Sequence, residues 1–336
     1  MNHGQTQERK KFSVRTDLAI EAREMLRKRQ QQEGEPDGIA VQTKQTEHYH
    51  LTQVRILTEE GSKTMGKPIG TYITLEAQKL KENDTVSHEA IIRALAQELQ
   101  KLLRVSRPQT VLVVGLGNWN ITPDALGPKV VSRILVTRHL QETLPQEMMN
   151  NVRPVAAVSP GVMGITGIET GEIVKGIVER MHPDLIIAID ALAARKTSRI
   201  NATIQLSDTG LAPGAGVGNK RKMLNEETLG VPVIAIGVPT VVDAATLVND
   251  TMDRMLAEMR SQTDKQTPFY QMLQEMEQEE KYELIAELLT PYAENMFVTP
   301  KEVDAVVDRL AHIIASAMNI ALQPEITLED MHRYSW

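Results

Sequence analysis

Four short runs of apolar residues recur through the middle of the chain, and they constrain its fold more than any other feature. The runs lie at 110–115, 155–158, 185–190 and 233–237. Each run is continuous rather than alternating, which is typical of strands buried on both faces of a sheet. Amphipathic helical stretches accompany them at about 126–140, 170–181 and 241–259. This alternation predicts an α/β fold, with a doubly wound, mostly parallel sheet flanked by helices.

The flanking regions add an N-terminal β-containing extension and C-terminal helices. We expect residues 18–105 to hold a short helix over about 18–31, three strands within 39–75 and a helix over 85–103, packed on the core. The core itself is predicted to span 106–260, with an edge strand at 201–206. Residues 261–336 are predicted to form a C-terminal helical region, with its last amphipathic helix over about 301–320.

Composition excludes several classes of protein. The 336 residues carry 37 Lys and Arg against 44 Asp and Glu, a net charge of −7. This balance disfavours direct binding of nucleic acid or an anionic membrane. With no cysteine, disulfides, thiolate nucleophiles and Cys-ligated metals are excluded. The polar N-terminus has no apolar signal segment, so we expect a cytoplasmic protein.

Two familiar motifs are incomplete. Gly115 and Gly117 follow a strand like the start of a dinucleotide fingerprint, but the third position is Asn120 and no ribose-binding acid closes the next strand. His88 begins a half HExxH motif whose second histidine is replaced by Ile92. A nucleotide-dependent oxidoreductase on a Rossmann-like core remains an alternative, and a zincin site is excluded.

A glycine-rich, basic segment, PGAGVGNKRK, occupies 213–222. It lacks the GK[ST] ending of a phosphate-binding loop. Two interpretations stay open. The segment is either a flexible connection with a solvated charge run, or a mobile loop in which Lys220, Arg221 and Lys222 receive an acidic ligand.

Two aspartates are the strongest candidates for chemistry. Asp124 lies in the loop after the first core strand, and Asp190 closes the strand LIIAID. Both are therefore expected at the carboxyl edge of the sheet, where ligand crevices of open α/β folds form. Neighbouring carboxylates repel, so one should retain its proton, and such a pair can activate a water and protonate a leaving group. The alternative is structural: Asp124 favours a helix N-terminus and Asp190 accepts backbone hydrogen bonds.

At these residues the chain resembles the germination protease family of spore-forming bacteria. The resemblance covers about 12–260 strongly and rests on the segments SVRTDLA (13–19), GLGNWNITPDALGP (115–128), VSPGVMGITGIET (158–170), IDALAAR (189–195), GAGVGNKR (214–221) and IGVPTVVDA (236–244). It implies a core similar to that of the hydrogenase maturation proteases. Asp124 and Asp190 then match the family's proposed catalytic pair, either as an atypical aspartic protease without a cofactor or with a metal ion held by the aspartates.

The resemblance also implies a substrate, an assembly and a mode of activation. The expected substrates are the small acid-soluble spore proteins of the spore core, and the expected assembly is a homotetramer. Members are made as zymogens that remove their own N-terminus, and they prefer to cut between an acidic and a bulky apolar residue that precedes alanine. The run Thr16-Asp17-Leu18-Ala19 fits this preference. Residues 1–17 are thus predicted to be a pro-segment, with Asp17–Leu18 as the self-cleavage bond.

Overall fold

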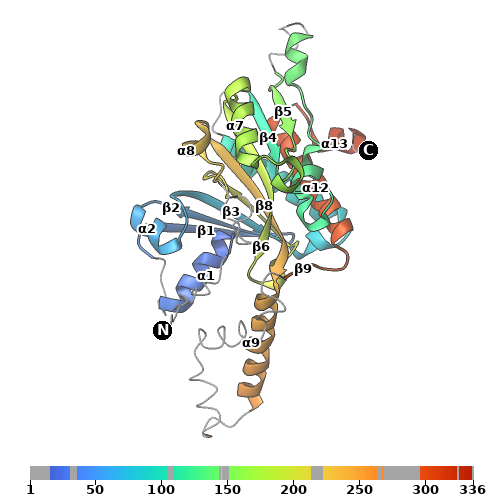
Figure 1. Ribbon diagram of the computed structural model, residues 1–336. Helices are drawn as coiled ribbons and strands as arrows, with labels where there is room; N and C mark the ends of the chain where they lie inside the picture. The colour runs from blue at the N-terminus through green and yellow to red at the C-terminus, as the bar shows by residue number, and fades with distance from the viewer. Residues whose placement is uncertain are drawn as a thin grey trace, which may run out of the picture.

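One mixed sheet of nine strands organises the part of the chain that the structure describes, and helices cover both of its faces (Figure 1). The structure is a computed structural model that describes residues 16–30, 36–103, 109–143, 145, 151–212, 222–262, 267, 296–323 and 325–334. The strands are β1 (Ile39–Gln45), β2 (His50–Ile56), β3 (Gly70–Glu76), β4 (Val111–Gly115), β5 (Val155–Val158), β6 (Leu185–Ala194), β7 (Thr203–Ser207), β8 (Val233–Asp243) and β9 (Phe297–Val298).

The order across the sheet is β1-β2-β3-β7-β8-β6-β4-β5, with β9 paired to the far end of β8. Strands β5, β4, β6 and β8 run parallel to one another. The other pairings are antiparallel. The predicted α/β class is confirmed. The parallel arrangement holds only for the four strands β8, β6, β4 and β5 at one end of the sheet, because the N-terminal strands continue the same sheet through β7.

Strand β7 corrects the prediction of an edge strand at 201–206. It lies inside the sheet, between β3 and β8. All five of its residues are buried. Its alternating polar residues therefore face other parts of the protein rather than water.

Helices pack on the two faces of the sheet. One face carries α3 (Thr85–Leu103), α4 (Leu126–Val131) and α12 (Val303–Leu322) around the largest apolar cluster. The opposite face of the parallel strands carries α7 (Thr170–Met181) and α8 (Glu226–Leu229). Farther along that face, α1 (Ala19–Gln30) and α2 (Glu59–Met65) cover β1–β3. Helices on both faces confirm the doubly wound arrangement.

The remaining helical segments are short or peripheral. They are η1 (Gln78–Lys81), η2 (Thr122–Asp124), η3 (Arg138–Glu142), α6 (Met163–Thr166), η4 (Thr197–Arg199), α9 (Ala244–Gln262) and α13 (Leu328–Tyr334). Among the described residues, α12 alone is long and apolar enough to cross a bilayer. Of its apolar stretch, 72% is buried inside the protein, as is typical of a core helix.

Several predicted boundaries are confirmed and others are wrong. Helix α3 begins at Thr85 as predicted, because the Asp84 carboxylate accepts a hydrogen bond from the Ser87 amide at 3.1 Å. The helix expected over 126–140 ends at Val131 and is followed by η3. The helix expected at 241 begins only at Ala244, because β8 continues to Asp243. The helix expected within 261–299 lies almost entirely outside the described residues.

Strand β6 is four residues longer than predicted, and this changes the place of Asp190. The partner strand β4 ends at Gly115, which pairs with Ile189. From Asp190 onward β6 keeps only β8 as a neighbour in the sheet. Asp190 is therefore the first β6 residue beyond β4, at a notch in the carboxyl edge, and not the last residue of its strand.

Two glycines bring β4 and α4 into direct backbone contact. A Cβ on Gly115 would lie 2.3 Å from the carbonyl oxygen of Gly127. A Cβ on Gly127 would lie 2.3 Å from the carbonyl oxygen of Leu116. Neither backbone can move aside as a flexible side chain would, so both positions require glycine. This approach closes the loop 116–125 tightly against the sheet.

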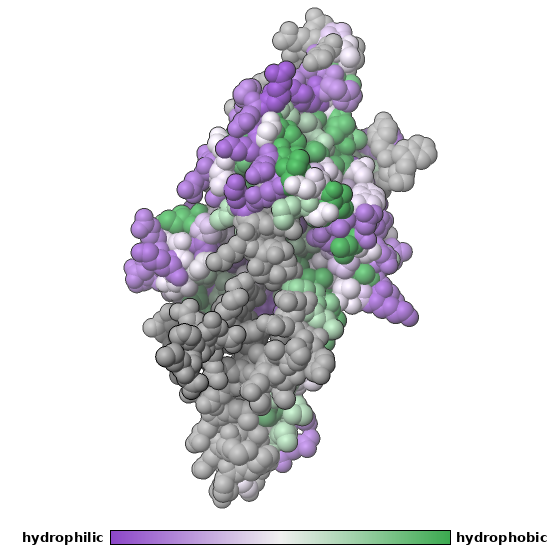
Figure 2. Space-filling model, in the orientation of Figure 1, coloured by the Kyte–Doolittle hydropathy of each residue, from purple (hydrophilic) through white to green (hydrophobic). Residues whose placement is uncertain are grey.

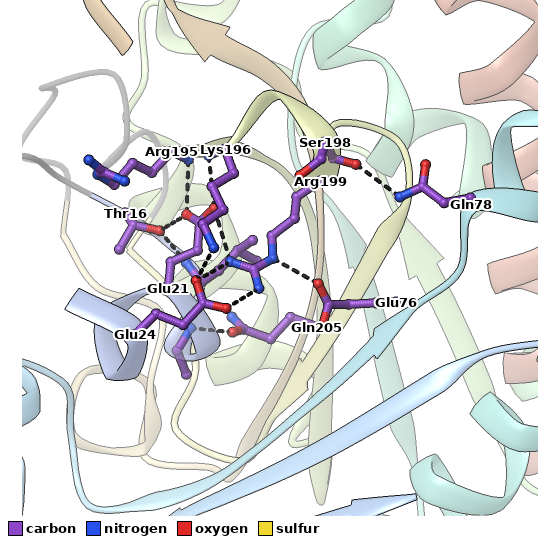
Figure 3. Close-up of polar contacts among 12 residues, drawn as sticks. Thr16, Glu21, Glu24, Glu76, Gln78, Arg195, Lys196, Ser198, Arg199 and Gln205 are labelled. Carbon is purple, nitrogen blue, oxygen red and sulfur yellow. Dashed lines mark hydrogen bonds and ion pairs between the residues drawn. The ribbon is translucent and has the colours of Figure 1, made fainter. Parts of the chain in front are cut away.

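Helix α1 is held to the body by charged groups (Figure 3). The buried Glu21 carboxylate accepts hydrogen bonds from the amides of Arg195 and Lys196, both at 2.9 Å. Glu24 receives the Arg199 guanidinium at 2.6 and 3.0 Å. Burial alone would raise the pKa of Glu24, but hydrogen bonds from Arg199 and Lys196 outweigh it and hold this pKa below its ordinary value.

We predict that Gly127→Ala destabilises the protein by about 1–3 kcal/mol, because the added methyl group overpacks the β4–α4 contact. The matched control is Gly176→Ala in α7, where an added Cβ has nothing within 4 Å. That control should raise the free energy of unfolding by about 0.5–1 kcal/mol, the usual gain of alanine over glycine in a helix. Urea unfolding of both variants measures the difference, and equal stabilities would contradict the role of Gly127.

A second prediction concerns the attachment of α1. A carboxyl whose pKa is lowered on folding stabilises the folded state above its ordinary pKa, and this contribution is lost as the pH falls through the lowered value. Hydrogen exchange of the α1 amides should therefore accelerate below about pH 4.5, the ordinary value for Glu24. Glu24→Gln should accelerate exchange already at pH 7, because it lowers the free energy of local opening of α1 by about 1–3 kcal/mol. The exposed Glu60→Gln is the control, and an unchanged α1 in Glu24→Gln would contradict the attachment.

Candidate active site

A cavity of about 400 Å³ opens at the notch beyond the end of β4. The loop after β4, the second half of β6 and the end of β8 contribute most of its walls. Its lining residues are Asp17, Leu116, Gly117, Ile121, Pro123, Asp124, Val162, Thr170, Asp190, Ala191, Leu192, Ala193, Ala212, Thr240, Val241, Phe297 and Thr299. The cavity thus brings Asp124 and Asp190 together with Asp17, three carboxyl groups from distant parts of the chain.

Asp190 is held by the strand that carries it. Its side chain is buried, with 6% of the residue exposed. One carboxylate oxygen accepts a hydrogen bond from the Ala191 amide at 2.9 Å. The sheet pairs Asp190 with Gly237 on β8, which presents no side chain of its own. The Leu192 side chain fills the place over Gly237, with its Cδ1 2.3 Å from where a Cβ would lie, and Asp190 and Leu192 both line the cavity.

Asp124 is held by a tight turn. The Asn118 amide donates to the Asp124 carboxylate at 2.8 Å and to its carbonyl oxygen at 3.1 Å. Gly117 makes this possible with a φ of +114°. A Cβ at Gly117 would lie 1.9 Å from the Asp124 carbonyl oxygen. Gly117 thus turns the chain sharply out of the sheet in direct backbone contact with Asp124.

The turn is anchored to the body on either side of Pro123. The Thr240 hydroxyl donates to the Pro123 carbonyl at 2.7 Å. The Thr122 hydroxyl donates to Asp304 at the start of α12, also at 2.7 Å. These two bonds tie η2 both to β8 and to the opposite layer, so Asp124 is supported from both sides.

Asp17 reaches the same cavity from the N-terminal segment. Its carboxylate accepts a hydrogen bond from the Ala193 amide at 3.1 Å. Its carbonyl oxygen accepts hydrogen bonds from Lys67 Nζ at 3.0 Å and from Gln205 Nε2 at 3.2 Å. Burial raises the pKa of the Asp17 carboxyl and lowers the pKa of the Lys67 ammonium. The next residue, Leu18, has no exposed surface.

A second cavity of about 590 Å³ adjoins the first. The two share Asp17, Leu192 and Ala212 as walls. Lys67 and Gln205 line only the second. The backbone of Asp17 thus lies between the two aspartates on one side and these two donors on the other.

The predicted basic cluster is not part of this arrangement in the described residues. Lys220 and Arg221 lie outside them. Lys222 is 69% exposed, pairs with Glu169 and Glu172 at 3.9 and 4.0 Å, and does not line the cavity. A role for this loop in binding an acidic ligand stays a prediction.

The cavity offers few ligands for a metal ion. Over the described ranges, no group of three or more His, Asp or Glu side chains is arranged to hold one. Asp124 and Asp190 would supply two carboxylates, the oxygen ligands that hard divalent cations prefer. A metal at this place would need further ligands from water or substrate.

Exposed apolar side chains gather in two segments that each contribute a wall residue to the cavity, Ile121 and Val162. Apolar patches interrupt the largely polar surface on the face shown in Figure 2. The exposed large apolar residues include Trp119, Ile121, Met163, Ile165 and Ile168. They come from the loop after β4 and from the segment around α6, and Ile121 itself lines the cavity. An extended polypeptide would find apolar contact surface on these two segments.

Sequence reasoning missed Lys67 and Gln205. Lys67 follows the glycine that ends α2 and carries no local pattern. Gln205 is a buried polar residue within an apolar strand, a combination that requires a hydrogen-bonding partner. That requirement was the one available signal, but it does not identify the partner as the N-terminal segment.

Comparisons with known proteins point to one family. A family model described as germination protease matches residues 19–270 and 257–335. A germination protease of Clostridium tetani is 52% identical over 323 residues, which cover 96% of this chain and 99% of that protein. One from Caldanaerobacter subterraneus is 51% identical over 96% of this chain and 98% of that protein. One from Bacillus mycoides is 45% identical over 97% and 98%.

Among solved structures, a NiFe hydrogenase maturation protease from Thermococcus kodakarensis matches with a TM-score of 0.33 and 18% identity. It covers 66% of this chain and 98% of that one. The family model and the relatives of similar length show the family without that likeness. Together they show that this chain belongs to the germination protease family of peptidases.

Proposed function

We propose that this chain is a self-processing endopeptidase whose water-activating pair is Asp124 and Asp190. The observation that carries the proposal is the meeting of both carboxylates with Asp17 in one cavity. Membership of a peptidase family makes the oxidoreductase alternative unnecessary. The substrate-like segment lies against the candidate catalytic groups, which is the arrangement that self-cleavage requires.

The proposed mechanism divides two roles between the carboxyl groups. The ionised carboxylate takes a proton from a water, and the water oxygen attacks the peptide carbonyl carbon. The protonated carboxyl gives its proton to the departing amide nitrogen. Backbone amides of Asn118 and Ala191 orient the two carboxyls. The runner-up is the same reaction with a metal ion held by the two aspartates.

The N-terminal segment is proposed to be the pro-segment of a zymogen. Of residues 1–17, only Thr16 and Asp17 are described, and Asp17 fills part of the candidate site. A substrate carboxyl cannot occupy that place while Asp17 is there. Self-cleavage at Asp17–Leu18 would free the segment to leave and open the cavity.

Residues 1–15, which carry the basic groups of the proposed pro-segment, lie outside the described residues, so their pairing with the body stays a prediction. The ion pairs of α1 lie after the proposed cut, with Glu21 and Glu24 facing Lys196 and Arg199 (Figure 3). They would keep α1 in place once the pro-segment has left.

We further propose that the substrates are the small acid-soluble spore proteins, that the enzyme acts in the spore core, and that it assembles as a homotetramer. The membership of the family supports these proposals. Incubating the purified, processed enzyme with a small acid-soluble spore protein and sequencing the fragments tests the substrate. Cuts after acidic residues are expected, and an intact substrate would contradict the proposal.

We predict that Asp190→Asn and Asp124→Asn each lower the rate of substrate cleavage and of self-processing by at least about 10⁴-fold, since each removes the only titratable group in its role. Light scattering and circular dichroism should show an unchanged, folded tetramer. The exposed Asp37→Asn is the control and should retain full activity. A folded Asp190→Asn enzyme with wild-type rates would end the aspartate-pair hypothesis. Loss of activity with a chelator and its return with a divalent cation would establish the metal alternative.

We predict that self-cleavage produces a new N-terminus at Leu18 and proceeds within one chain, because Asp17 lies in the cavity of its own subunit. The first-order rate should not change over a hundredfold range of protein concentration. It should rise as the pH falls from 7, because burial raises the pKa of Asp17 and mild acid neutralises a carboxylate beside two others. Asp17→Asn should flatten this part of the pH profile. A different new terminus, or a concentration-dependent rate, would show that the described placement is not the reacting one.

A further inference from the structure

We propose that Lys67 and Gln205 form the oxyanion hole of this enzyme. Their two donors hold the carbonyl oxygen of the residue that precedes the cleaved bond. The inference rests on the proposed function, because it takes Asp17–Leu18 as a bond that the site cleaves. It adds to that function a specific role for two side chains on the side of the bond opposite the aspartates.

The geometry at the Asp17 carbonyl is that of a two-donor clamp. Lys67 Nζ lies 3.0 Å and Gln205 Nε2 lies 3.2 Å from the oxygen. Both distances are within the hydrogen-bond range, and the donors come from separate elements, the end of α2 and strand β7. Backbone N–H groups usually provide such donors, and here two side chains take their place.

The orientation of the Gln205 amide follows from its other bond. Its Oε1 accepts the Ala19 amide at 2.7 Å, so Nε2 must face the Asp17 carbonyl. One side chain therefore holds the chain on both sides of the Asp17–Leu18 bond. Gln205 is itself buried in the interior of the sheet, so the clamp is rigid.

The sheet places this clamp in line with the aspartate pair. Gly237 of β8 pairs with Asp190 on one side and with Gln205 on the other. The three residues form one row across β6, β8 and β7, and side chains in such a row point to the same face. Two strand spacings separate the outer residues by about 10 Å. The Leu192 side chain covers Gly237, and a peptide lying over Leu192 would have Asp190 on one side and Gln205 on the other.

Lys67 brings the positive charge. Its backbone is fixed next to the left-handed Gly66, and the Ser62 hydroxyl donates to its carbonyl oxygen at 2.7 Å. Asp17 and Glu21 are the acidic groups that favour its charged form, whereas burial lowers its pKa. A cation in a poorly solvated place stabilises a developing negative charge more strongly than one in water.

Hydrolysis of the Asp17–Leu18 bond takes two stages. Water adds to the Asp17 carbonyl carbon, its proton passes to the ionised carboxylate, and the carbonyl π electrons move onto the oxygen held by Lys67 and Gln205. The C–N bond then breaks, the carbonyl re-forms, and the Leu18 nitrogen takes the proton of the neutral carboxyl. The products are a carboxyl group on Asp17 and a free amine on Leu18. The clamp holds the same oxygen throughout and exchanges no proton.

The main competing role for Lys67 is recognition of the Asp17 side chain, whose carboxylate it also attracts. The two roles differ in the group that the lysine contacts, the side-chain carboxylate or the main-chain carbonyl. Recognition depends on the carboxylate of the residue before the cut, whereas an oxyanion hole serves the carbonyl of any residue at that place. Changing Asp17 to the isosteric asparagine separates them.

The experiment measures first-order self-cleavage of the full chain in the wild type, Lys67→Met, Gln205→Glu and Asp190→Asn. Gln205→Glu keeps an oxygen for the Ala19 amide but loses the donor. Removal of one oxyanion donor is expected to lower the rate about 100- to 1,000-fold. Lys67→Met should cause the same fold-loss in the Asp17→Asn background as in the wild type. Loss confined to the chain with Asp17 would overturn the proposal in favour of carboxylate recognition.

A matched control and a structural readout complete the test. Lys63→Met removes an exposed lysine from the same helix and should leave the rate unchanged. Hydrogen exchange at the amides of α1 reports whether the segment stays docked. Slow cleavage with normal protection of the α1 amides supports the oxyanion hole. Loss of this protection in both Lys67→Met and Gln205→Glu would show that the two residues only dock the segment, and would overturn the proposal.

The outcome for the clamp is separate from the outcome for the proposed function. If the wild type does not cut itself at Asp17–Leu18, both the proposed cleavage site and the proposed oxyanion hole are wrong. If the wild type cuts there, Asp190→Asn does not, and Lys67→Met and Gln205→Glu cut at the wild-type rate, only the clamp is wrong.

Discussion

The unequal length of two neighbouring strands underlies the whole site. β4 stops at Gly115 while its parallel partner β6 continues to Ala194, so the sheet has a notch where Asp190 begins. The chain leaving β4 must turn at once, and the contact of Gly115 with Gly127 forces that turn back onto the sheet. Asp124 is thereby brought to the notch and held by the Asn118 amide. An uninterrupted pair of strands would have no room for either carboxylate.

The N-terminal segment depends on the same notch. Beyond β4, the free edge of β6 offers the amide of Ala193 to Asp17, and the two residues that follow the strand offer the amides of Arg195 and Lys196 to Glu21. The polar groups that an unpaired strand edge must satisfy are thus used to dock the segment that is proposed to be cut. In the proposed zymogen, inhibition and self-processing would depend on one set of contacts.

Much of the fold could be predicted from periodicity. The four continuous apolar runs became β4, β5, β6 and β8, and the helices α3 and α7 have the predicted bounds. Long-range pairing could not be predicted, because the alternation at 203–207 is the same for an edge strand and for one placed inside the sheet. The end of β6 was predicted wrongly for a related reason. A polar residue such as Asp190 after an apolar run usually marks the end of a strand, but pairing with β8 extends β6 to Ala194.

The sequence by itself determined which chemical groups are available: an α/β chain without cysteine, with aspartates at or after buried strands. The Asp17–Leu18 bond was suggested as a cleavage site by resemblance alone. Only the tertiary structure decided which groups meet. Lys67, Gln205 and Asp17 are separated by 50 and 188 residues along the chain, yet they join at one carbonyl oxygen. Such a contact leaves no periodic trace, because it depends on the register of β7 against β8 and on the docking of α1. The residue types determine which chemistry is available, whereas the pairing of the strands determines which residues lie close enough to act together.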